Sequence, residues 1–349
     1  MKFRDGGMML AVVKERIGKG WVLRDVPKPA PSRGEVLVRV KRIGICGSDL
    51  AIYDGREKDI RVPVIPGHEF AGEVVEKGAD VADVELGSRV AVNLVNNCGH
   101  CHDCRRGYPN LCLHSNLIGF HTNGGFAEYV VVPSQRCHVI PDSMTWDAAA
   151  SIEPVTSALA ALKKSGVRSS DSVAIIGPGP IGLYACQIAK LEGARRVFML
   201  GTRQSRLDVA TQLGAQKTIL VNREDPLLSL QEVLAGTNGR GVDVVLEASG
   251  SSGSVRLALK IAAKGARVIL LSIFHDSSSF EPMDIVFKQL ELYGSFDYGW
   301  IDFEQGRDLI AEGRVRTEPL ITHRYPLQSI EEGIRAMEEK KAIKVMIEP

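Results

Sequence analysis

The sequence predicts an α/β protein with two domains, one mainly β and the other built on a doubly wound parallel sheet. The first 150 residues consist of short strand-like runs separated by Gly and Pro. From about residue 155, strand-like and helix-like runs alternate instead. Such alternation is typical of a parallel sheet, because each helix carries the chain back between two strands. With 349 residues, the chain is long enough for two domains with sizeable cores.

The first predicted domain spans residues 1–155. Its clearest strands are residues 35–43, 71–78, 88–95 and 126–133, which are rich in Val and other strand-forming residues. Within this domain, residues 96–113 form a loop without apolar periodicity. Near residue 295 the later alternation of strands and helices breaks at GSFDYGW, so we expect residues 296–349 to return to this domain.

The second predicted domain spans residues 156–295. Its strands are expected at residues 172–177, 196–201, 218–221, 243–249 and 266–272. Helices are expected at residues 181–194, 204–213 and 254–263, and the first of these has apolar residues spaced i, i+3, i+4. This order predicts a parallel, doubly wound sheet.

The composition is that of an ordinary soluble protein. Lys and Arg number 43 against 42 Asp and Glu, and hydrophobic residues make up 44% of the chain. The net charge of +1 gives no reason to expect nucleic acid or an anionic membrane as a partner. No apolar run approaches the ~20 residues of a membrane helix, and the start MKFRDGGMML lacks a signal-peptide pattern. We therefore expect a cytoplasmic enzyme that acts on a small molecule.

Four cysteines lie close together in the 96–113 loop. Cys98, Cys101, Cys104 and Cys112 form a C-x2-C-x2-C-x7-C run, which suits the tetrahedral thiolate coordination of Zn²⁺. A metal cross-link would give order to a loop that has little core of its own. Two disulfides are the alternative, but thiols stay reduced inside cells. The loop therefore predicts a structural zinc site, and four thiolates leave that zinc no open position for chemistry.

A glycine-rich turn follows the predicted strand at residues 172–177 and opens a helix. Gly177, Gly179 and Gly182 give the pattern G-x-G-x-x-G, and Pro180 and Ile181 complete it. The glycines allow a tight turn, close backbone approach to a pyrophosphate, and close packing of helix on sheet. The helix N-terminus would present free N–H groups to the phosphates. This context predicts a dinucleotide site.

The end of the next strand indicates which nicotinamide cofactor binds. NAD sites usually carry Asp or Glu there to bind the ribose 2′-hydroxyl. Here the strand ends at Gly201 and is followed by Thr202, Arg203 and then Arg206. A small residue leaves room, a hydroxyl can donate, and two guanidinium groups can pair with a 2′-phosphate. We therefore predict a preference for NADP(H), with NAD(H) possible; the alternative is that both arginines are solvated charges on a helix surface.

A second set of metal-binding side chains precedes the turn. Cys46 lies in IGICGSD, His68 and Glu69 lie in PGHEFAGEV, and Glu153 lies in SIEPVTSA. One thiolate, one imidazole and one or two carboxylates make a mixed zinc shell with a position left for water or substrate. Taken singly, Cys46 is more often a small buried residue and His68 a core histidine. Together with the other two motifs they predict a catalytic zinc.

These motifs together resemble those of the zinc-containing medium-chain dehydrogenase/reductase family, with its polyol (sorbitol/L-iditol) and threonine dehydrogenase branches most similar. The resemblance covers essentially the whole chain. It rests on Gly67-His68-Glu69-x2-Gly72-x5-Gly78, the four-cysteine loop, Glu153-Pro154 and the nucleotide turn, which come in the family's order. It implies a GroES-like catalytic domain, a Rossmann domain, an active site in the cleft between them, and a homodimer or homotetramer.

The resemblance also implies roles for individual residues. Cys46, His68 and Glu69 match the family's catalytic-zinc ligands by position. Glu153 matches a residue that binds zinc directly in some relatives and lies just outside the shell in others. Zinc held in this way makes an alcohol more acidic and polarises a carbonyl, which favours hydride exchange with a nicotinamide ring. Ser48 matches the hydroxyl that lies beside the substrate oxygen and starts a proton relay.

One position departs from the family pattern. The relay commonly ends at a His five residues after the zinc-binding Cys, and here that residue is Ala51. Protons would leave by another route, through water ordered by Glu153 or Tyr53, or directly to solvent. This departure weakens assignment to the threonine dehydrogenase branch, which usually keeps the His.

The resemblance places three residues at the substrate pocket. Phe120 and Tyr298 match residues that line it in polyol-type relatives. Asp297 stands where sorbitol-type enzymes often have Arg, and a carboxylate there can accept hydrogen bonds from sugar hydroxyls or pair with an amino group. The alternative for Asp297 is a solvated loop acid.

The sequence thus predicts a zinc-dependent oxidoreductase that exchanges hydride between NADP(H) and a secondary alcohol or ketone of a polyol, sugar or cyclitol. The alternative within this class is an NAD-dependent threonine-type or simple alcohol dehydrogenase. A zinc-free reductase of the same superfamily would normally lack both the four-cysteine loop and the Gly67–Glu69 motif. A non-catalytic protein on the same scaffold is a third possibility.

Overall fold

The computed structural model describes residues 7–222 and 224–349, and the chain divides into two compact units. The first unit runs to Glu153 and resumes at Tyr298–Gly313 and Thr317–Pro349. The second comprises Pro154–Asp297 and Arg314–Arg316. The divisions therefore fall after residues 153 and 297, whereas the sequence placed them after residues 155 and 295. The assignment of 314–316 to the second unit agrees with the side chain of Gln187, which bonds both the N–H and the carbonyl of Arg316.

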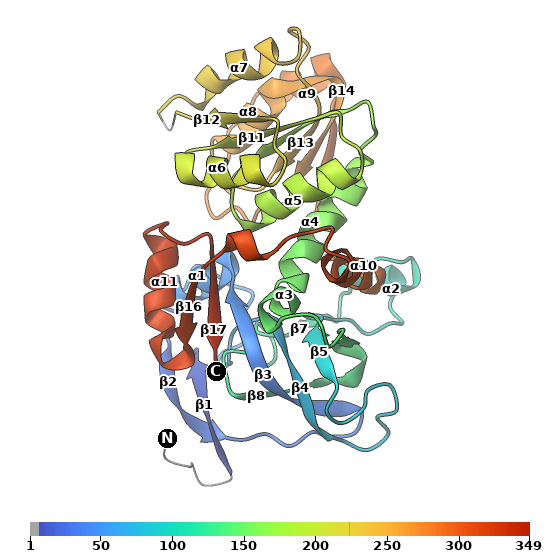
Figure 1. Ribbon diagram of the computed structural model, residues 1–349, viewed down its shortest axis with the longest axis vertical. Helices are drawn as coiled ribbons and strands as arrows, with labels where there is room; N and C mark the ends of the chain where they lie inside the picture. Colours follow the sequence, from blue (N-terminus) through green and yellow to red (C-terminus); the bar gives the residue numbers. More distant parts are fainter. Residues whose placement is uncertain (1–6, 223) are drawn as a thin grey trace. The chain divides into compact units, whose positions relative to one another are not determined.

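The described part of the second unit contains a six-stranded sheet in which all neighbouring strands are parallel (Figure 1). Its order, β12-β11-β10-β13-β14-β15, is that of a doubly wound dinucleotide-binding sheet and confirms the predicted α/β class. The strands are β10 (Ser172–Ile176), β11 (Arg196–Gly201), β12 (Lys217–Leu220), β13 (Val242–Glu247), β14 (Ala262–Leu270) and β15 (Glu291–Gly294).

The central strands of this sheet are apolar on both faces. Ala174 and Phe198 belong to one core cluster, which also contains residues of α7 and α8. Val173 and Val197 are fully buried too, yet they precede those residues by one position and so point to the opposite face. Both faces are therefore covered, which explains why the strands are continuous apolar runs in the sequence.

Helices connect the strands of the second unit. They are α4 (Ile152–Ser165, whose first two residues belong to the first unit), α5 (Pro180–Leu191), α6 (Gln204–Gln212), α7 (Ser229–Ala235), α8 (Ser254–Ile261) and α9 (Pro282–Lys288), with a short 3₁₀ turn at Pro226–Leu228. The helix predicted at residues 181–194 ends three residues early, and Gly193 in the turn that follows has a φ of +88°. The helix predicted at 254–263 ends at Ile261, because β14 begins at Ala262.

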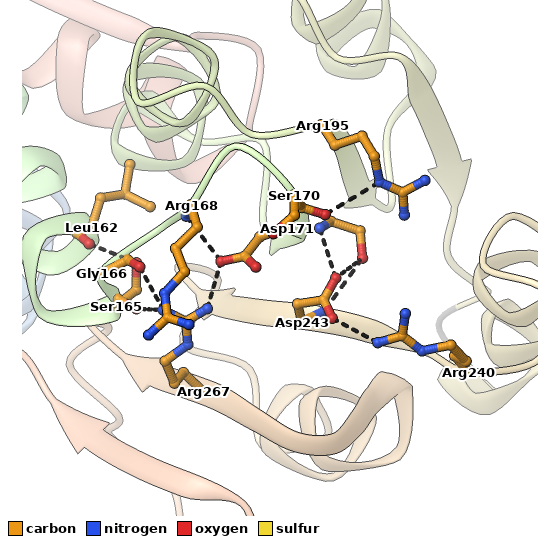
Figure 2. A network of polar contacts seen from close by, with 11 residues as sticks. Leu162, Ser165, Gly166, Arg168, Ser170, Asp171, Arg195, Arg240, Asp243 and Arg267 are labelled. Atoms are coloured by element: carbon orange, nitrogen blue, oxygen red, sulfur yellow. Dashed lines mark hydrogen bonds and ion pairs between the residues drawn. The ribbon is translucent and has the colours of Figure 1, made fainter.

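A polar network holds the loop between α4 and β10 (Figure 2). Arg267 on β14 pairs with Asp171 at 2.5 Å and donates to the carbonyl of Gly166 at 2.6 Å. Asp243 on β13 accepts from the N–H of Ser172 at 2.8 Å and from its hydroxyl at 2.7 Å. These bonds join β10, β13 and β14 at the start of β10, which is the end of that strand opposite the glycine-rich turn.

The described part of the first unit is mainly antiparallel. Its largest sheet has the order β16-β17-β3-β4-β5-β9, and β8 pairs with β3; only β16 and β17 are parallel. The strands are β3 (Glu35–Ile45), β4 (Glu69–Lys77), β5 (Arg89–Val92), β8 (Tyr129–Pro133), β9 (Cys137–Val139), β16 (Ile321–Pro326) and β17 (Lys344–Glu348). Two further pairs are β1 (Met8–Val13) with β2 (Val22–Pro27), and β6 (Val95–Asn96) with β7 (Asn116–Leu117).

The helices of the first unit are short. They are α1 (Gly47–Asp54), α2 (His102–Arg105), α3 (Trp146–Ala150), α10 (Trp300–Ala311) and α11 (Ile330–Glu338), with 3₁₀ turns at Pro109–Leu111, Ser134–Arg136, Glu318–Leu320 and Leu327–Ser329. The strand predicted at 88–95 is interrupted at Asn93, whose side chain accepts a bond from the N–H of Val95 and separates β5 from β6. Across the described residues of both units, no helix combines the length and apolar character needed to cross a bilayer.

Candidate metal centres and nucleotide site

The pairing of β3 with β4 brings together the residues predicted to bind the catalytic metal. Gly44, near the end of β3, is opposite Glu69, the first residue of β4. Cys46 follows β3 as the N-cap of α1, and His68 directly precedes β4. The Cys46 sulfur, a ring nitrogen of His68 and a carboxylate oxygen of Glu69 all lie within 4.8 Å of one another. His68 and Glu69 are buried, at 4% and 1% exposed, and Cys46 is half-buried.

Asp49 supports this cluster, although sequence reasoning did not identify it. One carboxylate oxygen accepts from the N–H of Cys46 at 2.8 Å, and the other lies 3.7 Å from Nδ1 of His68. Burial raises the pKa of Asp49 to about 6, an effect that the charge of His68 opposes. Burial also disfavours the charged form of His68, but Asp49 and Cys46 outweigh it and raise the pKa of the imidazole. The sequence feature that could have identified Asp49 is an acid three residues after a ligand Cys, in the first turn of a helix.

Lys344 is the second residue that sequence reasoning missed. It is 1% exposed, its ammonium donates to Oε2 of Glu69, and it lies 3.1 Å from the carbonyl oxygen of Ile45. Burial disfavours its charged form, but the charges of Glu69 and Cys46 raise the pKa of Lys344 above its ordinary value. Gly44 makes room for the pair, because a Cβ there would lie 2.2 Å from Oε2 of Glu69. The sequence feature that could have identified Lys344 is a lysine inside the apolar run AIKVMI near the C-terminus.

The donor set of this cluster fits zinc. Sulfur, imidazole nitrogen and carboxylate oxygen are all zinc ligands, and three protein ligands leave a fourth position open. Glu153 is 6% exposed and is close enough to influence the charge of His68, but it does not belong to the group of three mutually close ligand atoms. The carboxylates of Asp49, Glu69 and Glu153 outnumber the ammonium of Lys344 and the imidazole of His68. A divalent cation would offset the excess.

The structure also shows where the remaining residues that the sequence predicted for catalysis and substrate binding lie. Ser48 is half-buried in the first turn of α1, two residues after Cys46, and Ala51 on the same helix is fully buried. The ring centroid of Phe120 lies 5.2 Å from that of His68, so Phe120 borders the metal cluster. Tyr298 is buried and its ring lies 5.8 Å from that of Phe303. Asp297 has a φ of +46° and is half-buried rather than fully solvated.

The cysteine loop brings its four sulfurs together. Sγ atoms of Cys98, Cys101, Cys104 and Cys112 lie within 4.8 Å of one another. Backbone N–H groups point at them: that of Cys101 lies 3.3 Å from the sulfur of Cys98, and that of Cys98 lies 3.4 Å from the sulfur of Cys112. N–H donors lower the pKa of Cys98 and lower that of Cys101 to about 6, whereas burial raises the pKa of Cys112 to about 11. Four thiols with N–H donors in place fit a zinc–thiolate site.

A different feature of the structure explains why each position of the nucleotide turn is a glycine. Gly177 has a φ of +107°, and a Cβ there would lie 2.8 Å from the carbonyl oxygen of Ala248. A Cβ at Gly182 would lie 2.0 Å from the carbonyl oxygen of Gly177, so this glycine allows α5 to pack against the turn. Gly179 is the N-cap of α5, with Pro180 as its first and Ile181 as its second residue. A Cβ at Gly179 would enter open space, and a phosphate can approach the backbone there.

The structure gives a further reason for a glycine at position 201. We expected the small residue to leave room, but a Cβ there would lie 2.4 Å from Cγ of Pro178. Gly201 is therefore required by packing against the nucleotide turn. Beyond it, Thr202 is exposed, while Arg203, the N-cap of α6, and Arg206 are half-buried. Burial and, to a smaller extent, the charge of Arg203 lower the pKa of Arg206.

Comparisons with known proteins agree with this geometry. Residues 32–142 match the model of the alcohol dehydrogenase GroES-like domain, and residues 180–312 match that of zinc-binding dehydrogenases. An L-threonine 3-dehydrogenase of Bacillus licheniformis is 37% identical over 98% of this chain and 99% of its own. A D-arabitol-phosphate dehydrogenase of Enterococcus avium is 36% identical over 93% of this chain and 92% of its own.

A solved structure shows the same fold with a cofactor bound. A protein from Sinorhizobium meliloti 1021, described as a zinc-binding dehydrogenase and bound to NADP, superimposes with a TM-score of 0.90. It is 34% identical and covers 98% of this chain and 99% of its own. These similarities support zinc and a nicotinamide cofactor for the present protein. The chain belongs to the zinc-containing medium-chain alcohol dehydrogenase family, whose members are oxidoreductases acting on alcohol groups.

Proposed function

We propose that the protein is a zinc-dependent dehydrogenase that exchanges hydride between NADP(H) and a secondary alcohol or ketone of a polyol, sugar or cyclitol. The observation that carries the proposal is the buried cluster of Cys46, His68 and Glu69, whose ligand atoms lie within 4.8 Å of one another. In this proposal Cys98, Cys101, Cys104 and Cys112 hold a second, structural zinc. A zinc at the first cluster would supply an electrophile for the substrate oxygen.

Other residues near the cluster would orient the ligands, exclude water and transfer the proton. Asp49, 3.7 Å from Nδ1 of His68, would favour one orientation of the imidazole, and Lys344 balances the charge of Glu69. Phe120 lies against His68 and would exclude water from one side of the reacting carbon. Ser48 would exchange the proton of the substrate hydroxyl. Because Ala51 stands where a relay histidine is common, that proton would pass from Ser48 to ordered water rather than to an imidazole.

Two observations bear on the substrate class. Ala51 argues against a threonine dehydrogenase, and the similarity to D-arabitol-phosphate dehydrogenase favours a polyol or its phosphate. The second candidate function is oxidation of L-threonine with NAD⁺, which the similarity to L-threonine 3-dehydrogenase favours. Arg203 and Arg206 support NADP(H) over NAD(H), because two neighbouring guanidinium groups can bind a 2′-phosphate.

The experiment combines metal analysis with a substrate panel. Polyols, polyol phosphates, inositols, aminocyclitols and L-threonine are each assayed with NAD⁺ and NADP⁺, and zinc is counted in the purified protein. Two zinc ions per chain and the highest kcat/KM for a polyol-type substrate with NADP⁺ are expected. L-Threonine as the best substrate would select the second candidate. A single zinc that survives Cys46→Ala would contradict the catalytic site.

A further inference from the structure

A series of contacts links the cysteine loop to Arg136. Asn97, which immediately precedes Cys98, donates from Nδ2 to the sulfur of Cys104 at 3.6 Å. Its Oδ1 accepts from Nη1 of Arg136 at 2.9 Å, and the same nitrogen also donates to the carbonyl of Val95 at 2.9 Å. The amide of Asn97 therefore contacts both a predicted metal ligand and a guanidinium group.

Arg136 also contacts the first residue of α10. The guanidinium carbon lies 5.6 Å from the ring centroid of Trp300, which is within the range of a cation–π contact. The Trp300 ring also contacts the ring of His138, at 3.9 Å between centroids. The ring of His138 also contacts that of Phe303, one helical turn further along α10, with 4.5 Å between centroids and a tilted arrangement. The N-terminal turn of α10 thus rests on residues of β9 and of the short turn before it.

A second contact reaches α10 from within the cysteine loop. Pro109 lies between Cys104 and Cys112, and a Cβ on Gly299 would lie 3.7 Å from Cγ of Pro109. Gly299 is the N-cap of α10, and its N–H donates to the carboxylate of Asp302 at 2.9 Å. Pro109 of the cysteine loop therefore lies near the N-cap of α10, while the side-chain contacts run through Arg136.

The cysteine loop has few contacts that could order its four cysteines without a metal. The loop is mostly exposed or half-buried, so packing gives it little stability of its own. The four sulfurs lie within 4.8 Å of one another, so a single metal ion could bind all of them and cross-link the loop. Metal binding would therefore fix Cys104, the orientation of Asn97, and the acceptors that desolvated Arg136 requires.

We propose that Arg136 is a positioning residue that couples metal loading of the cysteine loop to the docking of the first turn of α10. Because Tyr298 directly precedes the N-cap Gly299, the same coupling fixes the backbone of Tyr298. The inference concerns the structural metal site alone and does not depend on the identity of the substrate or of the nicotinamide cofactor.

The chain contains a matched control for the Arg136–Trp300 pair. Arg89 lies 4.2 Å from the ring of Trp146, in the same unit, and donates to the carbonyls of Pro141 and Met144. None of these residues belongs to the cysteine loop. Trp146 should therefore not respond when metal enters the loop.

The experiment uses two full-length single-tryptophan proteins in a Cys46→Ser background, so that the loop is the remaining predicted thiolate site. One retains Trp300 (Trp21→Phe, Trp146→Phe) and the other retains Trp146 (Trp21→Phe, Trp300→Phe). Metal-free protein is titrated with Cd²⁺, and loading of the loop is followed by the ultraviolet charge-transfer absorption of the cadmium–thiolate bonds. We expect Trp300 emission to change in proportion to this absorption and Trp146 emission to stay constant.

Substitution of the arginine then tests the coupling. Arg136→Met should abolish the Trp300 response while one Cd²⁺ per loop still binds, with an affinity lower by roughly 5-fold or more because coupling is reciprocal. Arg136→Lys, which keeps the charge but lacks the planar fork, should give an intermediate response. Arg89→Met should leave the affinity of the loop within about twofold. A Trp300 response of unchanged size in either Arg136 variant, or no response in the parent protein, would overturn the proposal.

Discussion

Lys344 and Glu69 form an ion pair in which both side chains are almost completely buried, at 1% and 2% exposed. Burial of two charges costs solvation free energy, which their attraction repays only while both partners are present. Without metal, Lys344 is the cation that contacts the carboxylate of Glu69; with metal bound, a divalent ion would share that task. The stability of the protein should therefore depend on Lys344 more strongly when zinc is absent.

Lys344→Met tests this dependence. In metal-free protein the substitution leaves Glu69 buried without its counter-ion, and we expect a loss of about 3–5 kcal/mol in the free energy of unfolding. In zinc-saturated protein the loss should be clearly smaller. Urea denaturation with and without zinc measures both values.

The control for this prediction is a lysine whose partner is solvated. Lys77 lies 3.4 Å from Glu85, which is 82% exposed, so Lys77→Met should cost less than about 1 kcal/mol with or without zinc. Equal losses for Lys344→Met in the two metal states would show that Glu69 does not exchange between Lys344 and a metal.

Cofactor preference is a second property that single residues determine. Arg203→Ala combined with Arg206→Ala removes the two guanidinium groups beyond β11 and should raise the KM for NADP(H) by about 10-fold or more, since each contributes a charge-assisted bond to a phosphate. The KM for NAD(H) should change by less than about threefold. Steady-state kinetics with both cofactors measures the ratio. A parent protein that is already faster with NAD(H) would refute the assignment.

Gly201→Asp is not a suitable substitution for testing the preference between NADP(H) and NAD(H). A Cβ at that position would lie 2.4 Å from Pro178, so Gly201→Asp would disturb the nucleotide turn itself. A loss of activity in that variant would report packing rather than selectivity. Thr202 is exposed and follows immediately, so Thr202→Asp is the better way to introduce a carboxylate.

At the scale of elements, Asp243 connects β13 to β10 through hydrogen bonds from Ser172. Burial disfavours its charged form, but bonds from the N–H and hydroxyl of Ser172 and the charge of Arg240 outweigh burial and lower the pKa of Asp243. Its pKa in the folded state is thus below the unfolded value of about 3.9. The resulting stability is fully present above the unfolded pKa and is lost as the pH falls through the folded pKa.

Asp243→Asn should therefore destabilise the protein in a pH-dependent way. At pH 7 we expect a loss of about 1–3 kcal/mol, because Ser172 loses a charged acceptor. As the pH falls below about 4 and through the folded pKa of Asp243, the difference from the parent should shrink, because the parent carboxyl then becomes protonated too. Chemical denaturation at a series of pH values measures this difference. Asp208→Asn on the exposed face of α6 is the control, and its effect should stay within about 0.5 kcal/mol throughout.

The elements of the second unit could be predicted well because their signals are local. The strands at 172–177 and 196–201 are continuous apolar runs, and a parallel sheet buried on both faces produces such runs. The predictions were less accurate where a single side chain or tertiary contact ends an element. Asn93 interrupts the strand predicted at 88–95 by bonding the backbone, and nothing in strand propensity indicates this.

At the scale of the whole molecule, the family and the candidate ligands could be predicted because their motifs are contiguous in the sequence. Lys344 and Asp49 were missed, because their roles depend on their proximity in the fold to Glu69 and His68. Lys344 is 275 residues from Glu69 along the chain and reaches it only because β17 pairs with β3. Arg314–Arg316 likewise belong to the second unit through contact with Gln187, which the sequence alone does not reveal.

We propose that a second copy of the chain pairs with the protein at the edge of the parallel sheet. β15 is the last strand of that sheet, and its four residues are exposed. On the neighbouring helix α9, Val286 and Phe287 are 60% and 74% exposed. An open strand edge beside exposed apolar side chains favours pairing with another strand. A second copy of the same chain fits best, because two identical edges related by a twofold axis can pair antiparallel and bury both helices.

Phe287→Glu tests this arrangement. Two copies of the substituted helix would bring like charges together in an apolar contact, so the dimer should dissociate. Analytical ultracentrifugation should give the parent protein a mass of at least twice 37.9 kDa and the variant a mass of 37.9 kDa. Leu228→Glu, which changes a side chain that is 59% exposed in a 3₁₀ turn of the same unit, should leave the mass of the parent unchanged. Equal masses for the parent and Phe287→Glu would place the interface elsewhere.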